Sequence, residues 1–178
     1  MFDQVKVLPI TLLHYPAAHL IYRLKNRLNL PSLIVGSMFP DFEIPLILLL
    51  SGYRYNRLVL HSFFGAATLG TILSVLFTIS LYPVLAKTFF KVKKESVKAR
   101  TNLSVNLFIS CLFGNVSHVL LDILTHPSNP IFWPLQTTTV NPTYTSQLSL
   151  LVHIFSAALL PIVLIINRRN TWEKLLIR

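Results

Sequence analysis

The sequence TNLSVNLFISCLFGNVSHVLLDILTH occupies residues 101–126 and predicts one long apolar helix that ends in a polar motif. About 20 apolar residues in a helix are enough to cross the hydrocarbon core of a bilayer. His118, Asp122 and His126 follow one another at intervals of four residues, so a helix places them along one face. Pro127 then ends the helix, which puts His126 at or just past its last turn.

The His–Asp–His motif has two interpretations. Imidazole and carboxylate groups one helical turn apart are a geometry that metal sites on helices use. Asn115 falls on the same side of the helix, three residues before His118. The spacing alone supplies no partner ligands, so the His–Asp pair is equally interpretable as an internal hydrogen bond that helps helices pack.

The composition extends the membrane interpretation to the whole chain. Of the 178 residues, 53% are hydrophobic and only 12% are charged, against about 25% charged residues in soluble domains. We therefore predict an all-α fold, a polytopic integral membrane helix bundle that forms a single domain over residues 1–178. About four transmembrane helices are expected, at residues 58–86, 101–125 and 148–167 and, if they cross fully, at residues 28–52, together with an N-terminal helix that ends near residue 27 and a broken or re-entrant segment.

The second apolar run, residues 28–52, has an irregular centre. Pro40 and Pro45, with Gly36 upstream, argue against one smooth helix and favour a broken or re-entrant segment. Irregular backbone is tolerated at membrane depth only where protein or water satisfies it, and such a place suits a binding site. The alternative is a simple kink in which Asp41 caps the second half-helix. The sequence does not decide whether this run crosses the bilayer.

The net charge of +10 is distributed as in a membrane protein. Residues 87–100 hold six Lys and Arg, residues 126–147 hold none, and the tail after residue 167 holds four. By the positive-inside rule, the first segment and the C-terminal tail are cytoplasmic, and residues 126–147 lie on the other side of a cell membrane that the chain crosses several times. If residues 28–52 cross fully, His61 and the motif at 118–126 fall at the same, outer end.

The acidic residues and the remaining histidines complete the list of candidates. Asp41, Glu43 and Asp122 lie in apolar stretches, where an acid is costly and its default interpretation is functional. His61 suits either a ligand or a polar anchor near the start of its helix. His19 and His153 are interpreted as structural residues.

Four segments in this order resemble a known family. They are PITLLH at residues 9–14, VGSMFPDFE at 35–43, HSFFG at 61–65 and GNVSHVLLDILTH at 114–126. Together they resemble the membrane-bound metal-dependent hydrolases that include the YdjM-like proteins, over about residues 7–165. A more distant likeness is to zinc-dependent phospholipase C, which also gathers His and Asp from several helices.

The resemblance implies a site and a chemistry. The implied metal ligands are His14, Asp41, His61, His118 and Asp122, with Glu43 and His126 as neighbours. Zinc is the expected metal, with manganese as the alternative, because the ligands mix imidazole nitrogen with carboxylate oxygen. Glu43 and Asp122 are the candidate catalytic residues, Glu43 as general base. The expected reaction is hydrolysis of a phosphoester or another lipid headgroup bond at the membrane surface.

Two other functions remain open at this stage. Intramembrane His and Asp side chains also relay protons or pass cations, so a non-catalytic binding or transport protein is the alternative. A degenerate relative would keep the fold and use the same polar residues for packing. The expected partners are the lipid bilayer and a lipid substrate, and the grouping of basic residues between apolar runs argues against nucleic acid.

Overall fold

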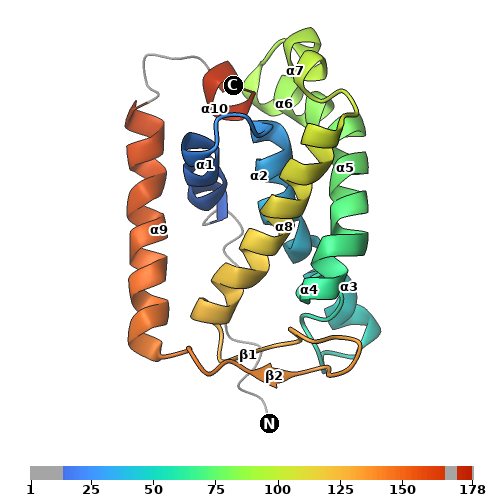
Figure 1. Ribbon diagram of the computed structural model, residues 1–178, viewed down its shortest axis with the longest axis vertical. Helices are drawn as coiled ribbons and strands as arrows, with labels where there is room; N and C mark the ends of the chain where they lie inside the picture. The colour runs from blue at the N-terminus through green and yellow to red at the C-terminus, as the bar shows by residue number, and fades with distance from the viewer. Residues whose placement is uncertain (1–13, 167–171, 178) are drawn as a thin grey trace.

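The computed structural model describes residues 14–166 and 172–177 and confirms the predicted all-α helix bundle (Figure 1). The predicted segment before His14 and the basic residues Arg168 and Arg169 lie outside the described residues. The helices are α1 (His14–Leu24), α2 (Leu30–Met38), α3 (Glu43–Leu50), α4 (Phe63–Gly65), α5 (Thr71–Ser80), α6 (Tyr82–Phe90), α7 (Lys94–Arg100), α8 (Val105–Thr125), α9 (Ser146–Ile166) and α10 (Trp172–Leu176). A 3₁₀ turn, η3 (Phe39–Phe42), joins α2 to α3, and a π turn, η4 (Ala66–Gly70), joins α4 to α5.

The chain passes back and forth along the long axis of the molecule. In Figure 1 the α2–α3 run descends, α4–α5 ascends, α8 descends and α9 ascends. Helices α6, α7 and α10 gather at the upper end, and a two-stranded antiparallel ladder of β1 (Ser128–Asn129) and β2 (Thr139–Val140) lies at the lower end. Residues 28–52 therefore run from one end of the bundle to the other and do not turn back.

Among the described residues, three helical stretches are long and apolar enough to cross a membrane. They are Leu30–Leu50, Phe63–Ser80 and Val105–Thr125, and a shorter apolar stretch covers Ser146–Leu159 within α9. The predicted helix over residues 58–86 is wrong at both ends. It begins at Phe63, after the Ser62 side chain caps Gly65 N–H, and it breaks at Leu81 where Pro83 starts the separate helix α6.

The break in the second apolar run is a single 3₁₀ turn. Pro40 has no N–H to donate to the carbonyl of Gly36, and its ring would clash with that carbonyl in a continuous α-helix. The chain tightens into η3 from Phe39 to Phe42 and resumes as α3 at Glu43. The Asp41 side chain does not cap the start of α3. The alternative prediction, a kink in which Asp41 caps the second half-helix, is therefore wrong about the cap. The turn instead presents Asp41 to α8.

Helices α2 and α8 are in direct backbone contact. A Cβ at Gly36 would lie 2.5 Å from Cys111 O, and one at Gly114 would lie 2.8 Å from Leu33 O. Small residues allow this close approach between membrane helices. At the upper end, Asn29 caps α2 by accepting from Ser32 N–H (3.1 Å), and its own N–H donates to Ser110 Oγ on α8 (2.8 Å). The α2–α8 pair is thus fixed in both spacing and register.

The two halves of the bundle differ in chemistry. The upper half is packed by apolar side chains of α1, α2, α6, α7 and α10. Lys and Arg of α6, α7 and the loop after α1 lie at this same end (Figure 1). In the lower half, the buried side chains include His61, His118 and Asp122. The fold therefore places one polar centre toward the end opposite the basic loops.

Candidate metal centre

Five predicted residues from separate segments meet at the polar centre. His14 begins α1, Asp41 lies in η3, His61 precedes α4, and His118 and Asp122 lie one turn apart on α8. His61 and His118 are fully buried, and Asp41 and Asp122 are at most 7% exposed. The geometry allows two overlapping groups of possible cation ligands, His14–Asp41–His118 and His61–His118–Asp122.

The hydrogen bonds of His61 and His118 fix which ring nitrogens face the centre. Nδ1 of His118 lies 2.8 Å from the carbonyl oxygen of Ser37, which only accepts, so Nδ1 carries the proton. Nδ1 of His61 lies 2.8 Å from Glu43 Oε1 and donates to that carboxylate. Each Nε2 is therefore free to present a lone pair in the neutral imidazole, and the two Nε2 atoms face one another at 3.3 Å.

Carboxylate oxygens complete the inner group. Asp41 Oδ1 lies 3.5 Å from His61 Nε2 and 3.6 Å from His118 Nε2. Asp122 Oδ2 lies 3.7 Å from His61 Nε2 and 3.9 Å from His118 Nε2. A tetrahedral site with bonds of about 2.0–2.2 Å sets ligand atoms roughly 3.3–3.6 Å apart. The measured separations begin in that range and exceed it by only a few tenths of an ångström.

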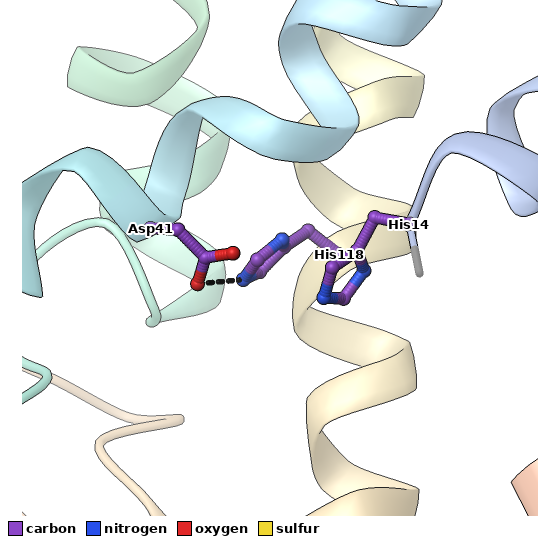
Figure 2. A group of neighbouring side chains, drawn as sticks. All are labelled: His14, Asp41 and His118. Carbon is purple, nitrogen blue, oxygen red and sulfur yellow. Dashed lines mark ion pairs between the residues drawn. The ribbon is translucent and has the colours of Figure 1, made fainter. Parts of the chain in front are cut away.

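His14 closes the group from the side of α1. Figure 2 shows Asp41 and His118 pointing toward one another, with the ring of His14 against the far side of His118. The two imidazoles stack with centroids 4.0 Å apart, and His14 Nε2 lies 3.9 Å from Asp122 Oδ1. Burial, and after it the proximity of His118, lowers the pKa of His14 to about 3, so this imidazole is neutral at pH 7.

Buried polar atoms in this centre lack hydrogen-bond partners. Among the described residues, Asp41 Oδ2 and His14 Nδ1 have none, although both atoms are shielded from solvent. Burial lowers the pKa of His61, but its hydrogen bonds with Asp41 and Glu43 outweigh burial and raise that pKa overall. Several hydrogen-bond acceptors thus converge on a site that has too few donors and that favours positive charge. These residues are chemically suited to hold a cation.

Glu43 lies behind His61 and does not face the inner group. Its Oε1 accepts from Leu58 N–H and from His61, and its Oε2 accepts from Leu60 N–H, each at 2.8 Å. Three N–H donors on one buried side chain are the pattern of an ionised carboxylate. The structure thus gives Glu43 the position of a group that orients His61 and the loop before α4, whereas the sequence predicts a general base.

Arg57 is a member of the site that sequence reasoning missed. It is buried, its Nε lies 3.2 Å from Asp122 Oδ2, and its Nη2 lies 2.9 Å from His126 Nε2. His126 sits just past the end of α8, as predicted, and accepts this bond. Burial lowers the pKa of His126 to about 4. The carboxylate of Asp122 raises this pKa, but burial and the positive charge of Arg57 outweigh it. The only sequence signal for Arg57 was its position four residues before His61.

The remaining polar residues have structural contacts. Asn115 donates to Ser74 Oγ and to Cys111 O, each at 2.9 Å, and so joins α8 to α5. His19 stacks near Tyr15, and His153 lies 2.7 Å from Ser149 O within α9. These contacts agree with the structural interpretation of His19 and His153.

The fold and site together define a class. The chain is an all-α bundle with three helices able to cross a membrane, and it gathers buried His and Asp side chains in one half of that bundle. It belongs to the family described as a domain of unknown function, DUF4184, whose model matches residues 8–176. No curated protein and no solved structure matches the chain.

Proposed function

We propose that this protein is a multi-pass membrane hydrolase that depends on a divalent metal. His14, Asp41, His61, His118 and Asp122 hold the metal, zinc first and manganese as the alternative, because the donor set mixes imidazole and carboxylate. When bound, such a cation acts as a Lewis acid and lowers the pKa of a water molecule to about 7. The resemblance to membrane-bound metal-dependent hydrolases points to the same class.

One observation carries the proposal. The Nε2 atoms of His61 and His118 face one another at 3.3 Å, and the partners of both Nδ1 atoms turn these two Nε2 atoms toward the carboxylates of Asp41 and Asp122. Two carboxylates beside two imidazole nitrogens in a buried site favour a positive charge between them, which a proton on His61 or a bound metal ion supplies. Ligating histidines that donate their second nitrogen to a carboxylate or a backbone carbonyl are typical of metal sites.

The residues around the centre favour a negatively charged ester as the substrate. Arg57 brings a buried guanidinium next to Asp122, and arginine is well suited to phosphate and carboxylate oxygens. The centre lies near the end of the bundle that carries the β1–β2 loop (Figure 1). A phosphoester, either in a lipid headgroup or in a small molecule at the membrane surface, fits this position and charge.

Transport is less well supported. A proton or cation pathway needs polar groups that continue through the bundle. Beyond the His–Asp centre, the buried side chains between α2, α6 and α10 are mainly apolar, and the buried polar side chains on α2, α5 and α8, such as Ser32, Thr78 and Ser110, carry no charge. This distribution supports a centre confined to one half of the molecule.

Metal content tests the proposed function. Detergent-solubilised protein reconstituted with zinc or manganese should retain about one metal ion per chain and melt at higher temperature than the metal-free form, because the ion binds only the folded state. The His118→Ala variant should lose most of the metal. His153→Ala is the matched control and should keep it, because among the described residues this histidine bonds to Ser149 of its own helix α9. A metal-free wild type after reconstitution with either ion would refute the proposal.

The proposed topology places the protein in the cell membrane with a cytoplasmic C-terminus. The basis is the concentration of Lys and Arg at the α6–α7–α10 end, whereas the loops that the structure describes at the other end contain only Arg54 and Arg57.

Single-cysteine labelling in intact cells tests this topology. Leu135 and Ala99 are exposed, and the native Cys111 is buried, so it gives little background. A membrane-impermeant thiol reagent should label Leu135→Cys and should reach Ala99→Cys only after the membrane is opened. The opposite pattern would reverse the proposed orientation.

A further inference from the structure

A second polar cavity lies beside the candidate metal centre. Its volume is about 260 Å³, and it lies between the loop after α3 and the segment that contains β1. Arg57 belongs to both places, since it lines this cavity and contacts Asp122 and His126 of the centre. The polar side chains of the lining include Arg54, Arg57, Tyr55, Asn56, Asn129 and Thr137.

The charge of the cavity is positive. Arg54 and Arg57 line it, and no acidic residue is among its lining residues. The carboxylate nearest to Arg57 is Asp122, which faces the histidines of the metal centre as well. Arg54 is exposed and has no acidic partner within salt-bridge distance among the described residues. The cavity therefore offers guanidinium groups to an incoming anion.

Asn129 supplies an independent observation. It lines the cavity and is 1% exposed, and neither Nδ2 nor Oδ1 has a hydrogen-bond partner among the described residues. A buried amide without partners is costly, at about 1–3 kcal/mol for each unsatisfied group. The pairing of β1 with β2, in which Asn129 lies opposite Thr139, holds this residue in place. Nδ2 is closed to solvent, so a small shift of the cavity wall would let a ligand accept its hydrogen bond and remove part of that cost.

We propose that this cavity binds the phosphate group of the substrate, in contact with Arg54, Arg57 and Asn129. Guanidinium groups bind phosphate oxygens through paired charge-assisted hydrogen bonds, and the Asn129 amide adds a neutral donor. The placement of the bound phosphate next to the metal centre rests on the proposed function, whereas the binding of phosphate itself does not require a metal. The shared chemistry is a phosphate monoester, free or in a lipid headgroup.

Calorimetric titration of the metal-free protein in detergent tests the proposal. The probes are inorganic phosphate, dioctanoyl phosphatidic acid as a lipid phosphate monoester, and dioctanoyl glycerol as the same lipid without phosphate. Wild type should bind phosphate and phosphatidic acid but not the glycerolipid. Arg54→Gln and Asn129→Leu should each weaken phosphate binding about tenfold or more, from the loss of one charged or buried donor. Arg100→Gln, an exposed arginine at the far end of the bundle, is the control and should bind like wild type.

The outcomes separate the two proposals. Tighter binding of phosphatidic acid than of inorganic phosphate identifies a lipid headgroup as the source, and equal binding identifies a free phosphate ester. No phosphate binding by wild type, or equal binding by wild type, Arg54→Gln and Asn129→Leu, overturns the phosphate subsite. Zinc content is measured on parallel samples of each preparation after reconstitution with zinc. Intact zinc binding with no phosphate binding overturns the subsite alone, and intact phosphate binding with no metal overturns the metal-dependent function alone.

Discussion

Replacing Glu43 by Ala is expected to destabilise the protein by several kcal/mol and to abolish metal binding at the centre. The carboxylate accepts from Leu58 N–H, Leu60 N–H and His61 Nδ1, each at 2.8 Å in a buried environment. Each donor left without an acceptor costs about 1–3 kcal/mol. The loop before α4 would also release His61, which then no longer presents Nε2 to His118. Chemical denaturation and metal analysis measure the two effects.

Two further variants distinguish orientation from catalysis at Glu43. Glu43→Gln keeps the shape but turns one oxygen into an NH₂ group that must face an N–H donor, so it should lie between wild type and Glu43→Ala in stability. Glu95→Ala, an exposed acid on α7, is the matched control and should unfold like wild type. A stable Glu43→Ala variant that still binds metal would contradict the orienting role and return Glu43 to the role of a general base.

Asp122→Ala is expected to lose metal affinity by 10-fold or more and to lose stability as well. From the sequence, this residue either ligates the metal or orients a ligating imidazole, and both roles predict such a loss of affinity. The structure adds a second cost, because Arg57 pairs with Asp122 at 3.2 Å and is buried. Removing one partner of a buried ion pair typically costs about 3–5 kcal/mol.

A double variant separates these two effects. Arg57→Met removes the buried cation, so Arg57→Met/Asp122→Ala should recover much of the stability that Asp122→Ala loses. It should not recover metal binding, because the carboxylate is still absent. Thermal melting and metal content of the two single variants and the double variant give the answer. Recovery of metal binding in the double variant would show that Asp122 serves only as the counter-ion of Arg57.

The helices were predictable from the sequence because apolar length is a strong signal. The run before His126 predicts the last residue of α8, Thr125, and places its start at residue 101, four residues before Val105, because Ser104 caps the helix there. On the condition that residues 28–52 cross fully, the grouping of basic residues predicted the His61 loop and the motif on α8 at the same end, and the structure brings His61 and His118 into contact. The five candidate ligands required a resemblance as well, since periodicity alone could relate His118 to Asp122 but not to Asp41 or His14.

Tertiary contacts account for what the sequence could not predict. Arg57 lies in a polar loop, and nothing local distinguishes it from the exposed Arg54; its burial follows from contacts with α8 across 65 or more residues. The role of Glu43 depends on a loop that folds back over the start of α3. Pro83 is a local signal for the break between α5 and α6, and the prediction of one helix over residues 58–86, which rested on the absence of charged residues, did not use it.

The backbone contact between Gly36 and Gly114 also determines how this protein meets membranes of different thickness. A bilayer that is too thin or too thick for a helix bundle forces its helices to tilt or bend. Helices α2 and α8 have no side chains between them at this contact, so they can tilt only as one body. The break at Leu81 and the outer helix α9 are the places left to absorb such a mismatch. Asp41 and His118 should therefore keep their spacing in lipids of different chain length.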